Sequence, residues 1–513
     1  MPEDVAAASI FEPGRTCWRV AWADRLGLVV DGAAYFRALR EALIAARQQV
    51  MLIGWDFDFE IEMLPGESDG DGMAPDGYPN VLGEFLEALV ARAPDLDLWL
   101  LKWNGALLVA PGRLAPTIAI RVFSHARIHF ALDGHHPLGA CHHQKIVVVD
   151  DALAFCGGID TTELRWDTAE HAPEDPRRVM RDGSPAPPWH DATTALAGPV
   201  ARALGDLSRT RWERATGDRI APPRGLAAAE ETCWPSTVAI DVEDVDVAIA
   251  RTEPPFGDDP LVNEIEELYL ALVRGARRII YIESQYFTTE TVCRAIEARL
   301  QEPGGPEVVV INPMAALGAL EDRAMHPLRG RVIRRLHRAD REGRFRIFYP
   351  VNAAERAIYV HAKVVVVDDR WLRMGSSNLD DRSMGFDTEC DVAFEGGDEA
   401  TRAAIDAFRH RLLAEHLGVE PADLARAENC EGSMVAAIEA LRRPHGRGLR
   451  VIACKKEDWL SRVLANTRLL DPRYHPGEPS RAGRFPQPRH VMAGFALLGA
   501  AALLWRAGRR RSR

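Results

Sequence analysis

An internal repeat constrains the fold more than any other feature, because three segments recur in the same order in both halves of the chain. The first segment reads as the end of a helix and then a buried strand, and in the third an acidic residue precedes a short strand that runs into a helix. Repeated helix–strand units predict an α/β fold of two pseudo-twofold-related α/β/α sandwich domains, with mixed β-sheets flanked by helices. The segment pairs are residues 42–57 and 271–287, 141–160 and 360–380, and 189–204 and 387–405.

The repeat also sets the expected domain boundaries. The join is expected in the stretch 234–259, which is rich in proline and acidic residues. Residues past about 430 have no counterpart in the first half and form a tail region. The predicted units are a first domain at 1–235 with a motif at 143–150, a second at 236–430 with a motif at 361–368, a C-terminal extension at 431–490, and an apolar run with an arginine-rich tail at 491–513.

Each half contains one copy of the pattern H-x-K-x-x-x-x-D. The residues after each lysine form a continuous β-branched run, which is typical of a central strand. Because side chains alternate along a strand, the histidine and lysine of each copy share one face, whereas the aspartate falls on the other face or in the following turn. We predict catalytic histidines and lysines and structural aspartates. The copies are His143, Lys145 and Asp150 in the first half and His361, Lys363 and Asp368 in the second.

A turn of small residues follows each motif at the same spacing, GGID at 157–160 and GSSN at 375–378. Small residues let the backbone approach a ligand closely, and serine and asparagine side chains can donate hydrogen bonds to phosphate oxygens. The predicted phosphate-binding residues are Gly158, Ser376 and Asn378. Asp160 stands where the second half has asparagine, and a carboxylate repels phosphate. We therefore expect Asp160 to turn toward a lysine or an incoming alcohol.

The doubled pattern H-x-K-x4-D-x6-G-[SG]-x-[ND] resembles that of the phospholipase D superfamily. Finer features are similar to the eukaryotic and plant-like branch, and the resemblance covers about residues 35–420. A single H-x-K would be weak evidence, whereas two full motifs with ordered companions are specific. The membrane-targeting N-terminal modules of the plant and animal enzymes have no match here, so their calcium dependence is not carried over. The companion motifs are HHQK at 142–145, RWDT at 165–168, PWHD at 188–191, YIESQYF at 281–287 and NLDDRSM at 378–384.

The resemblance implies ping-pong chemistry through a phosphohistidine, with His143 as the nucleophile and His361 as the acid and base. Lys145 and Lys363 would neutralise phosphate charge, a role that metal ions fill in other phosphoryl-transfer sites. We therefore expect no metal at this site and no cofactor. A lysine two residues from each histidine, on the same face, would also repel a cation.

A catalytic histidine needs a hydrogen-bond acceptor for its second ring nitrogen. The third repeated segment supplies an acidic residue at matching positions of the two halves, Asp191 and Glu389. We predict that these two carboxylates orient the catalytic histidines.

The net charge and the composition limit the class of partner and the cellular location that we expect for the protein. The net charge of −12 and the pI of about 5.8 disfavour a nucleic-acid partner. Eight scattered cysteines without a CxxC pair, and no basic-then-apolar N-terminus, fit a cytoplasmic protein. The apolar run 491–505 would span roughly 22 Å as a helix, short of the ~30 Å bilayer core. We expect peripheral association with the inner membrane or a tail anchor there; a buried core helix is the alternative.

These observations predict a phosphodiesterase that hydrolyses glycerophospholipids to phosphatidate and the headgroup alcohol, with transfer to a second alcohol as a further reaction. The expected partners are a phospholipid at a membrane surface and a water or alcohol acceptor. A cardiolipin synthase-like phosphatidyltransferase is the first alternative. A nuclease would use the same histidines but a basic groove, and an inactive membrane scaffold conflicts with the intact motifs.

Overall fold

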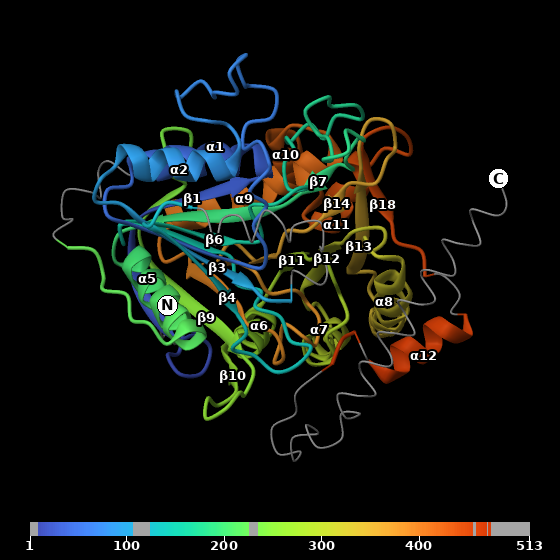
Figure 1. The fold of residues 1–513 in the computed structure, drawn as a ribbon. Coiled ribbons are helices and arrows are strands. Elements are labelled where there is room, and N and C mark those ends of the chain that lie inside the picture. Colours follow the sequence, from blue (N-terminus) through green and yellow to red (C-terminus); the bar gives the residue numbers. More distant parts are fainter. Residues whose placement is uncertain (1–8, 106–123, 225–233, 455–457, 469, 473–513) are drawn as a thin grey trace, which may run out of the picture. The chain divides into compact units, whose positions relative to one another are not determined.

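The computed structural model describes residues 9–105, 124–224, 234–454, 458–468 and 470–472. Within these residues the chain is mixed α/β: sixteen strands belong to one mixed sheet, and helices cover its faces (Figure 1). A separate two-stranded sheet pairs one short strand from each half. The predicted fold class of mixed sheets flanked by helices is confirmed.

The first half contributes eleven of the described strands and helices, and the last of them is a long helix. In chain order they are β1 (Arg19–Val30), α1 (Gly32–Ala45), β2 (Gln49–Gly54), α2 (Leu82–Arg92), β3 (Asp97–Trp103), β4 (Ile128–Asp133), β5 (Ile146–Val149), β6 (Leu153–Gly157), β7 (Trp189–His190), β8 (Ala192–Ala197) and α5 (Pro199–Thr216).

The second half follows the same plan and adds a C-terminal group. Its elements are β9 (Val242–Glu253), β10 (Val262–Asn263), α6 (Glu264–Gly275), β11 (Ile279–Glu283), α7 (Glu290–Gln301), β12 (Glu307–Ile311), α8 (Ala319–Ala339), β13 (Phe345–Val351), β14 (Tyr359–Val360), β15 (Val364–Val367), β16 (Trp371–Gly375), β17 (Glu389–Glu395) and α9 (Glu399–Leu417). The C-terminal group is α10 (Pro421–Glu431), α11 (Met434–Leu441), β18 (Gly448–Val451) and α12 (Trp459–Thr467).

The two halves have the same strand order. The first reads β4-β3-β2-β5-β6-β8-β1 and the second reads β13-β12-β11-β15-β16-β17-β9. In each half the first three strands are parallel and the remaining pairs are antiparallel. The antiparallel pair β1–β9 joins the halves into one sheet. This duplication agrees with the repeated segments, while the exact domain limits stay a prediction.

The stretch 234–259 is not merely the join that we expected. It contains β9, a twelve-residue strand that pairs with β1 on one side and β17 on the other. Acidic residues at its solvent-facing positions, Glu243, Asp244 and Asp246, hid the strand pattern in the sequence. The buried positions from Val247 onward are continuous and apolar up to Ala250, as expected for a central strand.

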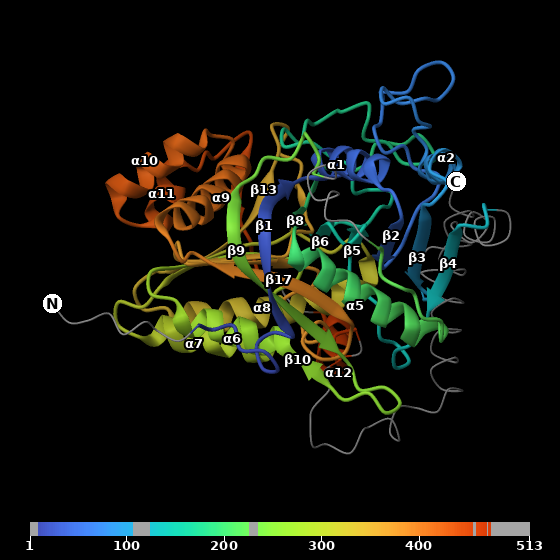
Figure 2. The ribbon, with the colours of Figure 1, turned by 90° about the vertical axis from the view of Figure 1, so that its left-hand side faces the viewer.

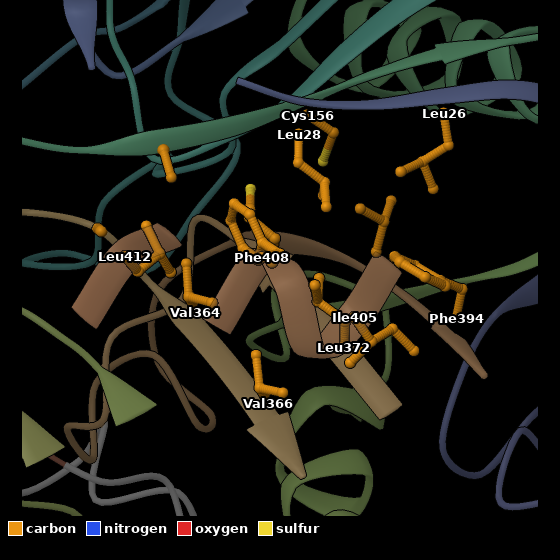
Figure 3. Close-up of a cluster of buried hydrophobic side chains, with 14 of the residues drawn as sticks. Leu26, Leu28, Cys156, Val364, Val366, Leu372, Phe394, Ile405, Phe408 and Leu412 are labelled. Carbon is orange, nitrogen blue, oxygen red and sulfur yellow. The ribbon is translucent and has the colours of Figure 1, made fainter. Parts of the chain in front are cut away.

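Three hydrophobic clusters show how the layers pack. Helices α1 and α2 cover one face of the first half, and α6, α7 and α8 cover the corresponding face of the second (Figures 1 and 2). A third cluster fills the space between the halves and takes in α5 and α9. Figure 3 shows part of it, where Leu28 of β1, Phe408 of α9 and Val364 of β15 belong to one buried core. The two halves therefore share a core.

The C-terminal group completes the second half. Strand β18 extends the sheet beside β13, and α12 packs on α8 through Met325, Leu328 and Ala465. None of the helices in the described part of the chain has both the length and the apolarity that crossing a bilayer requires. The predicted anchor at 491–505 lies outside the described residues.

Candidate active site

Both H-x-K motifs lie immediately before a central strand. His143 and Lys145 precede β5, and His361 and Lys363 precede β15. The backbone N–H of His143 donates to the carbonyl of Thr388 at 2.9 Å, which belongs to the other half. The N–H of His361 likewise donates to the carbonyl of His190, at 2.8 Å, in the first half. The motifs therefore lie where the two halves meet.

The histidine of each motif is oriented by a carboxylate from the opposite half. Nδ1 of His143 lies 3.0 Å from both oxygens of Glu389, and Nδ1 of His361 lies 2.6 Å from Oδ2 of Asp191. With Nδ1–H as the donor, the lone pair of each ring is on Nε2. The structure thus places both predicted carboxylates on the histidines, with a cross-over between halves that the sequence did not indicate.

Burial and nearby cations hold both imidazoles in the neutral form. Burial lowers the pKa of His143 well below its usual value, and the charges of Lys145 and Lys363 lower it further. Burial has the same effect on the pKa of His361, where Lys363 and Arg165 add to it. A neutral imidazole is the nucleophilic form, so each ring has a lone pair that can react.

The two lysines differ in their surroundings. Nζ of Lys145 lies 3.1 Å from Oδ2 of Asp160, so this carboxylate turns toward a lysine, one of the two orientations expected from the sequence. Nζ of Lys363 lies 3.5 Å from Oε1 of Gln285 and also donates to the carbonyl of His361. Burial lowers the pKa of Lys363 to about 7. The first lysine is thus paired with an anion, and the second has a lowered pKa.

Two of the three predicted phosphate-binding residues make contacts within the protein, and their phosphate-binding role stays a prediction. The N–H of Gly158 donates to Ala192 at 2.9 Å, and a Cβ at Gly158 would lie 2.2 Å from Oδ1 of Asp191. Glycine is needed there for the close approach of the carboxylate. Oγ of Ser376 lies 2.6 Å from Oε2 of Glu389 and accepts the N–H of Cys390 at 3.0 Å. Its hydroxyl supports the carboxylate.

Asn378 and Ser383 complete this side of the site. The backbone N–H of Asn378 donates to Oγ of Ser383 at 3.0 Å, while the side-chain Oδ1 is buried without a hydrogen-bond partner among the described residues. The side-chain oxygen is an acceptor and would not bind a phosphate oxygen, so the phosphate-binding role of Asn378 stays a prediction. Ser383 lies 2.7 Å from Oε1 of Glu389, a contact that the sequence pattern did not single out.

The motif aspartates fix the entrance to the neighbouring strand. Asp150 accepts the backbone N–H groups of residues 47, 48 and 49 at 2.7 to 2.9 Å, directly before and in β2. Asp368 accepts those of residues 277, 278 and 279 at 2.8 to 3.0 Å, before and in β11. Both lie away from the histidines in contacts that are purely structural.

Arg165 is a further cation near the site, and it was not among the site residues predicted from the sequence. Its guanidinium lies 4.3 Å over the ring of Trp189, whose indole is 5.2 Å from the ring of His361. The Nε of Arg165 is buried without a hydrogen-bond partner among the described residues. Because a buried guanidinium without an acceptor is costly, this group is available to an anionic ligand. The RWDT motif was the one signal that could have indicated it.

Two family models match the region that carries both motifs. The model described as "Phospholipase D" matches residues 133–293, and the model described as "Cardiolipin synthase, PLD-like domain" matches residues 269–412. The chain belongs to the phospholipase D superfamily.

Relatives within the superfamily are distant. Phospholipase D alpha 1 of Vigna unguiculata is 25% identical over 408 residues, which cover 56% of this chain and 50% of that protein. Phospholipase D alpha 1 of Nicotiana tabacum is 23% identical over 532 residues, covering 76% of this chain and 65% of that protein. The chain therefore spans about half to just under two thirds of the length of these relatives.

A solved structure shows the same fold. Phosphatidylserine synthase of Haemophilus influenzae Rd KW20 superposes with a TM-score of 0.53 at 12% identity, over 78% of this chain and 88% of the synthase. The superfamily fold thus extends over most of the chain, including strands that neither family model covers.

Proposed function

We propose that this superfamily member is a phospholipase D-type phosphodiesterase that hydrolyses a glycerophospholipid to phosphatidate and the headgroup alcohol. One observation carries the proposal. Two histidines lie in one site, and each is held by a carboxylate through Nδ1, with Nε2 left to react. This is the arrangement that a two-step displacement at phosphorus requires, with one ring as the nucleophile and one as the acid and base.

In the first step, Nε2 of His143 attacks the phosphorus of the diester. The bond from phosphorus to the headgroup oxygen breaks, and this oxygen takes the proton from Nε2 of His361. We assign the nucleophile to His143 on the resemblance and on exposure, since its side chain is 16% exposed and that of His361 is 5% exposed. An incoming anionic phosphodiester favours the protonated form of His361 and so supplies the acid.

In the second step, His361 accepts a proton from water as the oxygen attacks the phosphohistidine. The bond from phosphorus to Nε2 of His143 then breaks and phosphatidate leaves. Glu389 stabilises the positive charge that His143 carries as the intermediate. Its anionic form is itself stabilised by the hydroxyls of Ser376 and Ser383.

Cations and donors around the histidines bind the phosphate. Lys145, Lys363, Arg165 and Asn378 are the groups that would bind the phosphoryl oxygens, and the charge of the lysines and the arginine would stabilise the transition state. Lys145 is partly neutralised by Asp160, so Lys363 and Arg165 supply most of the net positive charge. The protein would act at a membrane surface, where its lipid substrate is found, and its acidic composition disfavours nucleic acid.

The second candidate is a phosphatidyltransferase of the cardiolipin synthase kind. The match of residues 269–412 to a cardiolipin synthase family model favours it. The chemistry is the same until the second step, where an alcohol such as phosphatidylglycerol replaces water. Hydrolysis and transfer then differ only in the acceptor.

The test is product analysis with mixed phospholipid vesicles and EDTA, with and without a small primary alcohol, read by mass spectrometry. We expect phosphatidate, diverted to the phosphatidyl-alcohol when the alcohol is present. Cardiolipin formed with release of glycerol would establish the transferase instead. If no lipid product formed while His143→Ala and wild type behaved alike, the proposal would be wrong.

A further inference from the structure

Behind the catalytic histidines lies a second group of ionisable side chains, which we call the histidine–carboxylate cluster. It consists of Asp31, His171, His190 and Glu415, and it is almost entirely shielded from solvent. Asp31 lies between β1 and α1, His171 lies in the loop before β7, His190 lies in β7 and Glu415 lies in α9. The cluster therefore joins three segments of the first half to a helix of the second.

The ligand atoms have the spacing of a tetrahedral metal site. Nδ1 of His190 lies 2.8 Å from Oε1 of Glu415 and 3.3 Å from Oδ1 of Asp31. Nε2 of His171 lies 3.1 Å from Oε1 of Glu415 and 4.0 Å from Oδ2 of Asp31. With metal–ligand bonds of about 2.0 to 2.1 Å, the ligand atoms of a tetrahedral zinc site lie about 3.3 Å apart. These four distances fall around that value.

The two imidazoles have the outer contacts that metal ligands usually have. The second nitrogen of His171, Nδ1, lies 3.0 Å from Oδ2 of Asp167. The second nitrogen of His190, Nε2, lies 2.8 Å from Oε2 of Glu283. A carboxylate in this position fixes the tautomer, so that the unprotonated nitrogen of each ring points to Glu415 and to the metal position. Without an ion, each ring must carry a proton on both nitrogens to satisfy its neighbours.

Asp31 is an independent sign that something is bound. It stands at the N-terminus of α1 but its side chain makes no capping hydrogen bond, and its backbone is strained at φ 67°. Its Oδ2 is buried without a hydrogen-bond partner among the described residues. Its Oδ1 accepts the N–H of Asp191 at 3.4 Å, but a strained, buried carboxylate that does not cap its helix and leaves Oδ2 without a donor is costly, and a cation would compensate it.

We propose that the histidine–carboxylate cluster binds one divalent transition-metal ion, Zn²⁺ being the best match, through two imidazole nitrogens and two carboxylate oxygens. Imidazole ligands favour zinc over calcium or magnesium, which prefer oxygen. Four protein ligands make this a closed, structural site. The ion is separate from the phosphodiesterase chemistry, and its binding does not depend on the proposed function.

The ion would stiffen the support of one catalytic histidine. His190 is adjacent to Asp191, and its carbonyl accepts the N–H of His361 at 2.8 Å. A metal on His190 therefore holds β7 in place, and with it the carboxylate that orients His361. Its main measurable effect is on the stability of the folded chain, since metal bound only in the native state stabilises that state.

The test uses the full-length chain without a histidine tag, stripped with a strong chelator and titrated with Zn²⁺ or Co²⁺. We expect one zinc per chain by mass spectrometry of the metal content, and a Tm several degrees higher with zinc than after chelation. With Co²⁺ we expect the visible absorption of a tetrahedral site without a thiolate charge-transfer band, which separates this site from binding to the free cysteines.

Variants locate the ion. His171→Gln and Glu415→Gln should each lose the bound metal and the zinc-dependent rise in Tm. His410→Gln is the matched control, because His410 also lies between two carboxylates, Glu428 at 3.0 Å and Asp406 at 3.3 Å, but outside the cluster. It should bind zinc as the wild type does. If wild-type protein takes up no metal, or if folded His171→Gln and Glu415→Gln bind it unchanged, the proposal is overturned.

Discussion

Glu389 illustrates how the site keeps a buried carboxylate useful. Burial raises its pKa well above the usual value, which alone would leave it protonated. Hydroxyls of Ser376 and Ser383 each donate to one of its oxygens, and both contacts oppose this rise in its pKa. Asp191, which has the same role for His361, receives the N–H of Ala192 at 2.9 Å instead. The two halves therefore support equivalent carboxylates with different donors.

Replacement of Ser376 tests this assignment. In Ser376→Ala, Glu389 loses one donor and holds His143 less well, so kcat should fall by about 10-fold while KM is nearly unchanged. A phosphate-binding serine would instead raise KM. Ser208→Ala is the control, because it removes a buried hydroxyl that bonds only to Leu204 in α5. Steady-state kinetics on the folded variants distinguish the two roles. A rise in KM with constant kcat would show that Ser376 binds phosphate.

The pH profile follows from His143 and Lys363. The pKa of His143 is held well below 6.5, so the acid limb of kcat/KM, where the nucleophile becomes protonated, should have its midpoint below pH 6.5. The pKa of Lys363 is about 7, so the phosphate-binding charge is lost as the pH rises through that value and KM should increase. Lys363→Arg should move this alkaline limb upward. A profile flat from about pH 6 to pH 9 would contradict the assignment to Lys363, and an acid limb with its midpoint above pH 6.5 would contradict the assignment to His143.

At the scale of elements, the motif aspartates link one strand end to the start of its neighbour. Asp150 and Asp368 both have a left-handed backbone, at φ 53° and φ 56°, which places each carboxylate against three successive N–H groups of the adjacent turn. The odd spacing from the histidine indicated that these residues lie off the catalytic face. The identity of their partners depends on the antiparallel pairing of β5 with β2 and of β15 with β11, segments some 90 to 100 residues apart, which the local pattern does not contain.

Asp368→Ala should therefore act on folding. Three buried or half-buried N–H groups lose their acceptor, and we expect the free energy of unfolding to fall by about 2–4 kcal/mol. Asp369→Ala removes the next carboxylate along the chain, which has a more exposed position, and should cost much less. Urea unfolding measures both. Equal stability of Asp368→Ala and wild type, with loss of turnover, would make Asp368 a catalytic group.

At the scale of the whole molecule, the two halves complete each other. The repeat in the sequence indicated the two related halves, the paired motifs and the two carboxylates, because each is a feature of one half. It did not indicate that Glu389 serves His143 and Asp191 serves His361, which are 246 and 170 residues apart. Pairing of β1 with β9 and the core between the halves determine that exchange. The histidine–carboxylate cluster was not predicted from the sequence either, because its residues also come from both halves.

Because all these groups come from one chain, the active site is complete within a single molecule. A mixture of His143→Ala and His361→Ala proteins should be as inactive as either variant alone. Phosphatidate formation from vesicles measures this, with wild-type protein diluted into each variant as the positive control. Activity restored by mixing would mean that each site is built from two chains.

The phosphohistidine is tested most directly with a lipid whose leaving group is p-nitrophenol, since this group departs without an acid. The enzyme, at a concentration at which one p-nitrophenol per chain is detectable, is mixed with phosphatidyl-p-nitrophenol. Absorbance follows the burst of p-nitrophenol, and intact-protein mass spectrometry under alkaline conditions detects the adduct. In His361→Ala we predict a burst of about one p-nitrophenol per enzyme and a phosphatidyl adduct on His143 that hydrolyses slowly. No burst and no adduct in His361→Ala, or the same burst in His143→Ala, would contradict the mechanism.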